Sequence, residues 1–385
     1  MVRRHDREAD AAHARRAHAD DRALHVRALR RVRRRHLHQA ARLGGSGTLI
    51  LGLACEGTIG GPPARGVTVA EERLEQALFE IRRVIAGQDA MLERVLVCLL
   101  AQGHLLIEGV PGLAKTLTIK TTAAVLGGSF ARIQFTPDLV PADLVGTRVY
   151  RPDTGTFDTE LGPVFCNFLL ADEINRAPAK VQSALLEVMQ ERQVTIAHAS
   201  HPVPDPFLVL ATQNPIESEG TYPLPEAQVD RFMLKILIGY PEHDEELTIV
   251  QRQLSAAPEL REVLTLDELR ALQRKVFDVY VDPALISYTV SLAAATRAPS
   301  DYVSYGASPR GPISVTQAAR ALALIRGRDY VTADDVRALA KDAFRHRLVL
   351  SYQALAEGVT PDAILDGVLT EVPVPEVQLA RPAAV

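Results

Sequence analysis

The sequence predicts an α/β protein in which a parallel sheet carries helices on both faces and a smaller all-helical domain follows. Two observations support this class. From about residue 67 to residue 240, short continuous apolar runs alternate with stretches of helical periodicity, and strands that are apolar throughout are typical of parallel sheets buried on both faces. Beyond Pro241 the strand pattern ends and amphipathic helical patterns continue, which indicates the second domain.

The predicted elements follow in chain order. "VAEERLEQALFEIRRVI" begins the folded chain as a helix, because apolar residues recur at helical spacing from Leu74 to Ile85. The predicted strands are "HLLIEG", "FARIQF", "FCNFLLAD", "FLVLAT" and "FMLKILI", and helices follow Lys115 and cover residues 179–190. In the second domain, "SVTQAARALALIRG" and "TADDVRALAKDAFRHRLVL" predict helices, and Thr332 is expected to cap the latter.

Four segments are expected: an N-terminal extension (1–66), an α/β core (67–240), a helical domain (241–373) and a C-terminal tail (374–385). Residues 1–66 hold fourteen Arg, no Lys and six acidic residues, a balance of +8, so the chain's net charge of −4 leaves −12 for the remainder. The interleaving of Arg with Asp, Ala and His predicts a disordered extension or a misassigned start codon. A nucleic-acid-binding arm is the less favoured alternative.

Composition narrows the class further. With 385 residues and 47% hydrophobic content, the chain is long enough to bury a sizeable core. No apolar run reaches the roughly 18 residues that a membrane-spanning helix needs, so we expect no membrane insertion and a cytoplasmic location. Cys55, Cys98 and Cys166 show no CxxC spacing, which predicts reduced, structural cysteines rather than a disulfide framework.

The loop after the first predicted strand has the pattern of a phosphate-binding loop. It reads Gly109, Val110, Pro111, Gly112, Leu113, Ala114, Lys115 and Thr116, and a helix follows. In that context backbone N–H groups and the helix N-terminus face the phosphates. Lys115 would reach the β- and γ-phosphates, and Thr116 would ligate Mg²⁺. Ala114 replaces the last glycine of the usual pattern; we expect φ to stay negative there and the loop to function.

Polar residues also follow two later strands. "FLLADEINRAP" ends in Asp172, which suits a Mg²⁺ ligand, and Glu173, which suits a base that takes a proton from the attacking water. The alternative is a pair of acids that stabilise a helix start. "FLVLATQNP" ends in Asn214, which suits a group that orients water against the γ-phosphate or, alternatively, a turn residue before Pro215.

These strand ends, in this order, resemble the AAA+ ATPases and, more narrowly, the MoxR family. The similar stretches are "GVPGLAKT", "LLADEINRAPAKVQSALLEVMQERQVTI", "VLATQNPIESEGTYPLPEAQVDRF", "GASPRG" and "FRHRLVLSYQALAEG". They span about residues 67–373, and an alanine at the place of Ala114 is usual in this family. The resemblance implies an AAA+ P-loop core with a helical lid, ATP and Mg²⁺ as cofactors, and a homo-oligomeric ring, with a hexamer expected.

The resemblance also implies two arginine roles. Arg231 in "EAQVDRF" looks like an arginine finger that completes the site of the neighbouring subunit, the alternative being an ion pair with Asp230 or Glu226. Arg310 in "GASPRG" looks like a second sensor that reaches from the lid to the γ-phosphate of its own subunit, the alternative being a solvated helix-start arginine.

Further positions carry weaker implications. By the same resemblance Asn214 is the first sensor, and Gly87 and Gln88 in "VIAGQDA" are similar to the segment that packs near adenine. Arg176 in "INRAP" faces the subunit interface or forms a structural salt bridge. Both alternatives stay open.

Two insertions agree with the family. Residues 146–165, with a "DTG" turn, look like a hairpin inserted in the second helix, and "RQVTIAHASHPVPDP" resembles the hairpin before the first sensor. His198 and His201 lie in the second insertion, but no third ligand is near in sequence, so a metal site there is not expected.

The leading hypothesis is therefore an Mg²⁺-dependent ATPase ring that remodels or matures client proteins, with a partner that carries a von Willebrand factor A domain. Nucleic acid is not an expected partner. The alternatives are a metal-chelatase-type motor subunit, a DNA-associated AAA+ ATPase and a nucleotide-gated scaffold without turnover. The presence of Glu173 and Arg231 argues against the scaffold, because binding alone needs neither residue.

Overall fold

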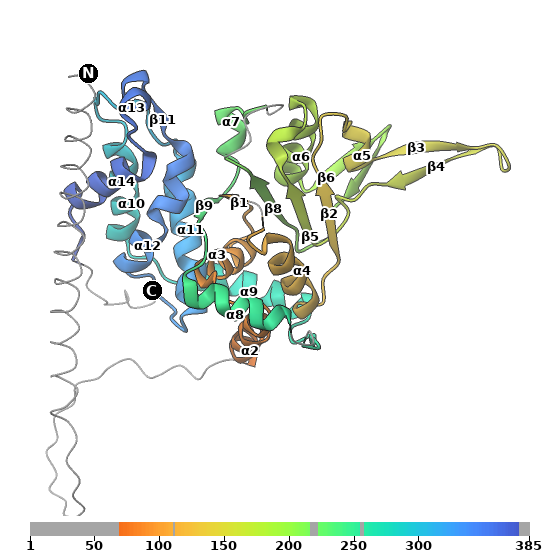
Figure 1. Cartoon of the computed structure of the whole chain (residues 1–385), viewed down its shortest axis with the longest axis horizontal. Helices are drawn as coiled ribbons and strands as arrows, with labels where there is room; N and C mark the ends of the chain where they lie inside the picture. The colour runs from red at the N-terminus through yellow and green to blue at the C-terminus, as the bar shows by residue number, and fades with distance from the viewer. Residues whose placement is uncertain (1–68, 111, 216–221, 255–257, 377–385) are drawn as a thin grey trace, which may run out of the picture. The chain divides into compact units, whose positions relative to one another are not determined.

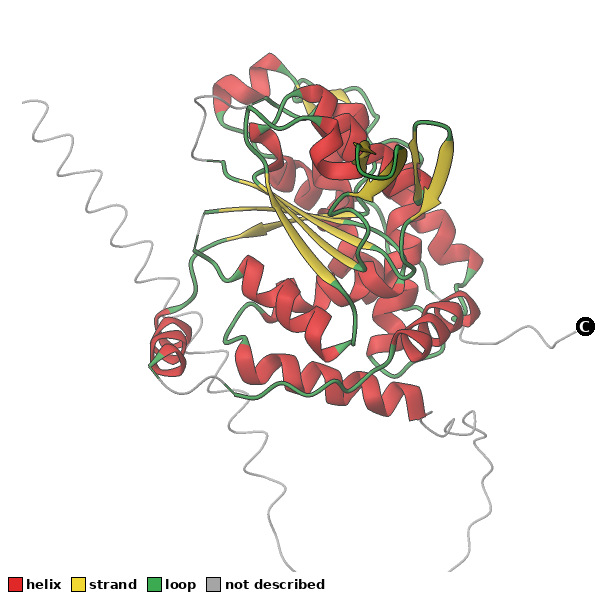
Figure 2. Cartoon of the chain, turned by 90° about the vertical axis from the view of Figure 1, so that its right-hand side faces the viewer, coloured by secondary structure: helices red, strands yellow, loops and turns green. Residues whose placement is uncertain are grey.

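A five-stranded parallel sheet forms the centre of the computed structural model, which describes residues 69–110, 112–215, 222–254 and 258–376. The strand order is β2-β5-β8-β1-β9, and helices lie on both sides of the sheet (Figures 1 and 2). The strands are β1 (Leu105–Gly109), β2 (Phe130–Gln134), β5 (Phe168–Asp172), β8 (Leu208–Gln213) and β9 (Leu234–Ile238). All five predicted strands are confirmed, and so is the fold class.

The continuous apolar character of the strands has a direct cause. Successive side chains point to opposite faces of the sheet, and each face has its own buried cluster. Leu105 and Ile107 pack with α2, α3 and α4, whereas Leu106 packs with α6. These helices are α2 (Val69–Val84), α3 (Asp89–Leu100), α4 (Lys115–Val125) and α6 (Ala179–Glu191).

The C-terminal part of the described chain is largely helical, as predicted. It contains α8 (His243–Gln253), α9 (Leu266–Asp278), α10 (Pro283–Ala295), α11 (Arg310–Ile325), α12 (Ala333–Phe344), the 3₁₀ turn η2 (Arg345–Arg347), α13 (Tyr352–Glu357) and α14 (Pro361–Glu371). Thr332 caps α12 in a capping box with Asp335, which confirms that prediction. A short antiparallel pair, β10 (Val303–Tyr305) and β11 (Val349–Leu350), was not predicted.

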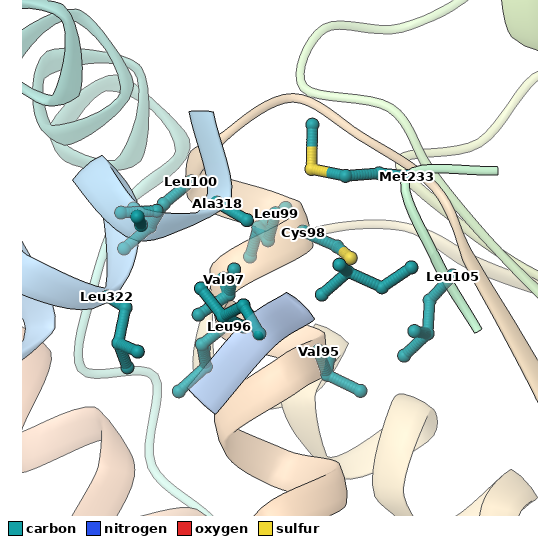
Figure 3. Packing of buried hydrophobic residues seen from close by; sticks show 14 of the residues in the cluster. Val95, Leu96, Val97, Cys98, Leu99, Leu100, Leu105, Met233, Ala318 and Leu322 are labelled. Carbon is teal, nitrogen blue, oxygen red and sulfur yellow. The ribbon is translucent and has the colours of Figure 1, made fainter. Parts of the chain in front are cut away.

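Helix α3 joins the sheet to the helical lid. Its residues Val95 to Leu100 lie between Leu105 and Met233 on one side and Ala318 and Leu322 of α11 on the other (Figure 3). One buried cluster therefore runs from β1 through α3 into the lid. Since burial of apolar surface is the main favourable term in folding, this cluster ties the lid helices to the face of the sheet that carries α3.

Both predicted hairpins are present. β3 (Gly146–Arg151) pairs with β4 (Thr156–Leu161) and extends away from the sheet (Figure 1), and β6 (Gln193–Ile196) pairs with β7 (Ala199–Pro202). The remaining short elements are α5 (Pro141–Val145), η1 (Ile174–Arg176) and α7 (Glu226–Val229).

The structure can also be compared with the expectations for the cysteines, the N-terminal extension and membrane insertion. Cys98 and Cys166 are buried and free, whereas Cys55 and residues 1–66 lie outside the described part of the chain. None of the described helices combines the length and the apolar content that crossing a membrane requires.

Candidate active site

The candidate site lies where the parallel strands end. Gly109, Asp172 and Gln213 close β1, β5 and β8 at the same edge of the sheet. The chain moves from β1 to the far edge at β2 and returns, so β1 marks a reversal of strand order, and ligands of open α/β sheets bind beside such reversals. A cavity of about 440 Å³ opens there. Its lining residues are Gly109, Gly112, Leu113, Ala114, Lys115, Thr116, Leu117, Arg132, Gln134, Asp172, Glu173, Thr212, Gln213 and Asn214.

The loop from β1 to α4 has the form expected of a phosphate-binding loop, with one correction. Ala114 has φ 54° and ψ 16°, so the expectation of a negative φ is wrong. The left-handed conformation lets the chain turn into α4 while the Ala114 carbonyl accepts from the Thr118 N–H. Val110 does not line the cavity, and Pro111 lies outside the described residues.

Two glycines of the loop have different reasons to be glycine. A Cβ on Gly109 would lie 2.6 Å from the Ile238 carbonyl oxygen of β9, so close strand packing excludes a side chain. Gly112 has φ +86° and no atom within 4 Å of its Cβ position. Its backbone conformation rather than crowding requires glycine there, and the loop faces open space on that side.

Lys115 lies at the centre of the loop. Its Nζ donates a hydrogen bond to the Gly109 carbonyl, 2.6 Å away. Burial lowers the pKa of Lys115, and the nearby charges of Asp172 and Glu173 oppose that effect. The ammonium group is therefore held at the cavity by a neutral acceptor, the Gly109 carbonyl, which a phosphate oxygen could replace.

Asp172 is held by groups from both neighbouring strands. One carboxylate oxygen accepts a 2.6 Å hydrogen bond from the Thr212 hydroxyl of β8, and the other accepts from the Arg132 guanidinium of β2 at 2.7 Å. Thr212 also accepts from the Glu173 backbone N–H at 2.8 Å. The Thr212 hydroxyl thus fixes both strand-end acids.

Glu173 adopts a left-handed backbone, with φ 55°, and two side chains contact one oxygen of its carboxylate, Oε2. Gln134 of β2 donates to it at 2.6 Å, and Arg176 forms an ion pair with it at 2.9 Å. The salt-bridge interpretation of Arg176 is therefore realised. Thr212, Arg132 and Gln134 were not predicted as site residues, although polar side chains near the ends of apolar strands were a usable signal.

The oxygen donors of the cavity suit a hard divalent cation. Thr116 and Asp172 both line it, and hydroxyl and carboxylate oxygens are the ligands that Mg²⁺ takes in phosphate sites. Asn214, 8% exposed, lines the same cavity. Within the described residues there is no group of three His, Cys, Asp or Glu side chains that could hold a metal.

Two predicted site residues lie elsewhere. Arg231 lines a separate surface pocket with residues of α6, and within the described part of the chain it forms no ion pair. The alternative pairing with Asp230 is not formed, because Asp230 instead pairs with Arg347 at 2.7 Å. Arg310 has its Nε 3.9 Å from the Asp230 carboxylate and is not among the residues that line the cavity.

Gly87 and Gln88 also lie outside this cavity. Gly87 borders a pocket with Glu245 of α8. Gln88 shares a pocket of about 260 Å³ with Ile238, and Ile238 is the register partner of Gly109. The Gln88 pocket is therefore next to the phosphate-binding loop.

The sheet order, the strand–loop–helix at its centre, the adjacent strand-end acids and the helical lid define a P-loop protein of the AAA+ class. Residues 104–234 match the family described as "ATPase family associated with various cellular activities (AAA)", and residues 295–368 match the AAA lid domain. The chain is 54% identical over 326 residues to Chaperone MoxR1 of Mycobacterium tuberculosis, covering 82% of this chain and 86% of that protein. It belongs to the MoxR family of AAA+ ATPases.

Further similarity supports this assignment. Protein MoxR of Methylorubrum extorquens is 30% identical over 329 residues, covering 77% of this chain and 93% of its own. A crystal structure of a protein described as a candidate ATPase from Cytophaga hutchinsonii aligns with TM-score 0.76 and 43% identity, covering 80% of this chain and 96% of that one. Membership of this family implies nucleotide binding, and AAA+ proteins usually assemble as rings.

Proposed function

We propose that this protein is an Mg²⁺-dependent ATPase that works as a homo-oligomeric ring, with six subunits expected, and uses hydrolysis to remodel or mature client proteins. The observation that carries the proposal is the convergence of Lys115, Thr116, Asp172, Glu173 and Asn214 on one cavity at the strand ends. The name of the chaperone relative supports the client-directed part.

The phosphate-binding loop holds the triphosphate. The loop and the start of α4 line the cavity, where their backbone N–H groups would face a phosphate and Lys115 would exchange the Gly109 carbonyl for phosphate oxygens. Thr116 and Asp172 would hold Mg²⁺, and the ion would supply positive charge to offset that of the phosphates. Arg132 would then compete with the ion for the negative charge of Asp172.

Glu173 is the proposed base and Asn214 the group that orients the attacking water. A carboxylate that takes a proton must lie within hydrogen-bond reach of the water. Gln134 and Arg176 both contact the same carboxylate oxygen of Glu173, Oε2, so we propose that the other oxygen, Oε1, takes the proton. The contacts of Oε2 with Gln134 and Arg176 would then hold the Glu173 side chain in place while Oε1 acts.

Arg231 and Arg310 complete the proposed site from different subunits. Arg231 lies outside the cavity of its own chain and is without an ion pair within the described residues, which supports a role in the neighbouring subunit's site. There its charge would stabilise the transition state. Arg310 is proposed as the sensor of its own subunit, and it must leave Asp230 to reach a phosphate.

The remaining assignments stay proposals. We place adenine beside Gln88, because its pocket adjoins the loop through Ile238; Gly87 would then contribute backbone. The core is taken as 67–240 and the lid as 241–373. A partner with a von Willebrand factor A domain and a cytoplasmic location remain predictions.

The test is the specific ATPase rate of the full chain as a function of protein concentration, with Mg²⁺ present and mass measured by light scattering. A rate that rises as rings form supports the shared site. A monomer with a rate independent of concentration would remove Arg231 from a role in a neighbouring subunit. If no hydrolysis is found, ATP binding by itself would point to a nucleotide-gated scaffold or to a motor that needs its partner.

A further inference from the structure

A buried polar junction links the segment that carries Arg231 to the lid. The segment runs from Asp230 to Met233, between α7 and β9. It is contacted by Arg347 of η2, whose side chain is 2% exposed. The lid is thus joined to this segment by a desolvated charged group, in addition to the apolar contacts through α3.

The guanidinium of Arg347 contacts the residues immediately before and after Arg231, which are Asp230 and Phe232. Its Nε donates to the Asp230 carboxylate at 2.7 Å. Its Nη2 donates to the carbonyls of Asp230 and Phe232, at 3.1 and 2.8 Å. The neighbours of Arg231 on either side are therefore fixed, whereas the Arg231 side chain extends to the surface pocket beside α6.

The start of lid helix α11 meets the same carboxylate. The Ser308 hydroxyl lies 3.0 Å from both oxygens of Asp230 and accepts from the Arg310 backbone N–H at 3.2 Å. The Arg310 guanidinium is 3.9 Å from Asp230. Asp230 is consequently shared by the proposed sensor segment and by the anchor Arg347, and it is the residue immediately before Arg231.

We propose that Asp230 is a positioning residue for Arg231, through which the lid of a subunit sets the direction of the arginine that the same subunit offers to its neighbour. The proposal rests on the proposed function, since it takes Arg231 to act in a neighbouring subunit. A lid rotation must carry residues 230–233 with it or leave the buried guanidinium of Arg347 without its counter-charge, and burial of an unpaired charge is costly. If Arg310 moves from Asp230 to a phosphate, Asp230 loses its contact with Arg310 and keeps its contact with Arg347.

The variant Asp230→Asn tests the proposal because it keeps the shape and one hydrogen-bond acceptor while removing the charge. Its own nucleotide cavity stays intact, so ATP affinity should remain within about twofold of wild type, while turnover at saturating ATP falls by roughly tenfold or more, as expected when a finger arginine is misplaced. Ser308→Ala is a milder second variant, which removes only the hydroxyl contacts. Thermal melting and ring mass verify that both variants fold and assemble.

Mixed rings separate a misplaced finger from a damaged lid. Lys115→Ala subunits bind no ATP but offer an intact Arg231. Adding them in excess should restore turnover in Asp230→Asn subunits, as it should for Arg231→Ala subunits, because each active cavity then receives a correctly placed arginine. Glu357→Gln is the control: Glu357 accepts from the Tyr302 hydroxyl within the lid, and neither residue contacts residues 230–233 or lines the cavity or the Gln88 pocket, so its turnover should match wild type.

The outcomes are distinct. Rescue of Asp230→Asn to the extent seen for Arg231→Ala supports positioning in the neighbouring site. Rescue of Arg231→Ala without rescue of Asp230→Asn or Ser308→Ala would overturn the inference and leave the proposed function standing, because the defect would then lie in the subunit's own cavity. Wild-type turnover in Asp230→Asn would also overturn it. If Arg231→Ala itself is not rescued, the shared site and the inference both fail.

Discussion

The strand-end cavity and the lid junction use the same chemical groups in opposite ways. In the cavity, Asp172 pairs with Arg132, whose side chain is 48% exposed. At the junction, Asp230 pairs with Arg347, whose side chain is 2% exposed. The two carboxylates are similarly exposed, at 18% and 20%, so the difference lies in the arginines. Water can replace the partners of the exposed Arg132 guanidinium at little cost, whereas the desolvated Arg347 guanidinium depends on its protein partners. We infer that Asp172 in the cavity can exchange Arg132 for a ligand, whereas the contacts of Arg347 at the junction persist.

The largest expected effect is the loss of nucleotide binding in Lys115→Ala. Because the ammonium group contributes charge-assisted contacts to phosphate, ATP affinity should fall by roughly a hundredfold or more. Titration with a fluorescent ATP analogue measures this. Lys120→Ala, an exposed position on the same helix, is the matched control and should bind as wild type; equal losses in both variants would mean that the cavity does not hold phosphate through Lys115.

Glu173→Gln should keep ATP affinity and lose turnover. A positioned base contributes roughly 10²- to 10⁴-fold, and the amide cannot take the proton. Steady-state hydrolysis and ring mass in the presence of ATP measure the effect, and the assembled state should persist. Glu160→Gln on the exposed hairpin strand β4 serves as control. Turnover near wild type in Glu173→Gln would remove this residue from the base role.

The free energy of unfolding tests the difference between the Asp172–Arg132 pair and the Asp230–Arg347 pair directly. Arg347→Met should lower the free energy of unfolding by about 3–5 kcal/mol, since it breaks a buried pair and leaves buried carbonyls without a donor. Arg132→Met should change it by about 1 kcal/mol or less, because that pair is exposed. Chemical denaturation of both variants provides the test, and equal changes would abolish the distinction between the two regions.

A subtler effect concerns Mg²⁺. Arg132 competes for the Asp172 carboxylate, so Arg132→Gln should lower the Mg²⁺ concentration for half-maximal turnover by roughly two- to fivefold, the range of an exposed charge pair. Turnover measured across Mg²⁺ concentrations at fixed ATP tests this, with Arg148→Gln on the hairpin as control. An increase instead would assign Arg132 to phosphate binding rather than to restraint of Asp172.

The smallest expected effect is at Ala114. A left-handed backbone costs an L-residue roughly 1 kcal/mol, and glycine removes that strain while adding unfolded-state entropy. Ala114→Gly should therefore leave ATP affinity unchanged and raise Tm by about one or two degrees, given the usual scaling. A drop in Tm, measured by calorimetry, would show that the Ala114 side chain packs usefully.

The strands and the loop could be predicted because their signals are local. "FLLAD" is apolar on both faces and ends in the acid that lines the cavity, so one stretch of sequence predicted both the buried strand and the site residue at its end. Thr212 and Arg132 escaped prediction because their role depends on lateral strand pairing: each meets Asp172 from 40 positions away. The Ala114 backbone was mispredicted because the turn into α4, not the residue type, sets φ.

The contacts of the lid junction could not be predicted from the sequence. "FRHRLVL" matched the family, yet nothing local indicates that Arg347 pairs with Asp230, 117 positions away. The strands β10 and β11 are also too short for an alternating pattern to show. Local patterns therefore predict which residues chemistry needs at strand ends, while long-range contacts decide what holds those residues in place.

The presence of Gly109 in the loop motif is not by itself evidence of nucleotide binding. Since its lack of a side chain is required by the Ile238 carbonyl of the adjacent strand, selection for a foldable sheet alone preserves it. A descendant of this protein that had lost ATP binding would still keep Gly109, while Lys115, Asp172 and Glu173 would be free to drift. Evolutionary decay of activity in such lineages should therefore be sought at the charged positions, where the fold exerts no comparable constraint.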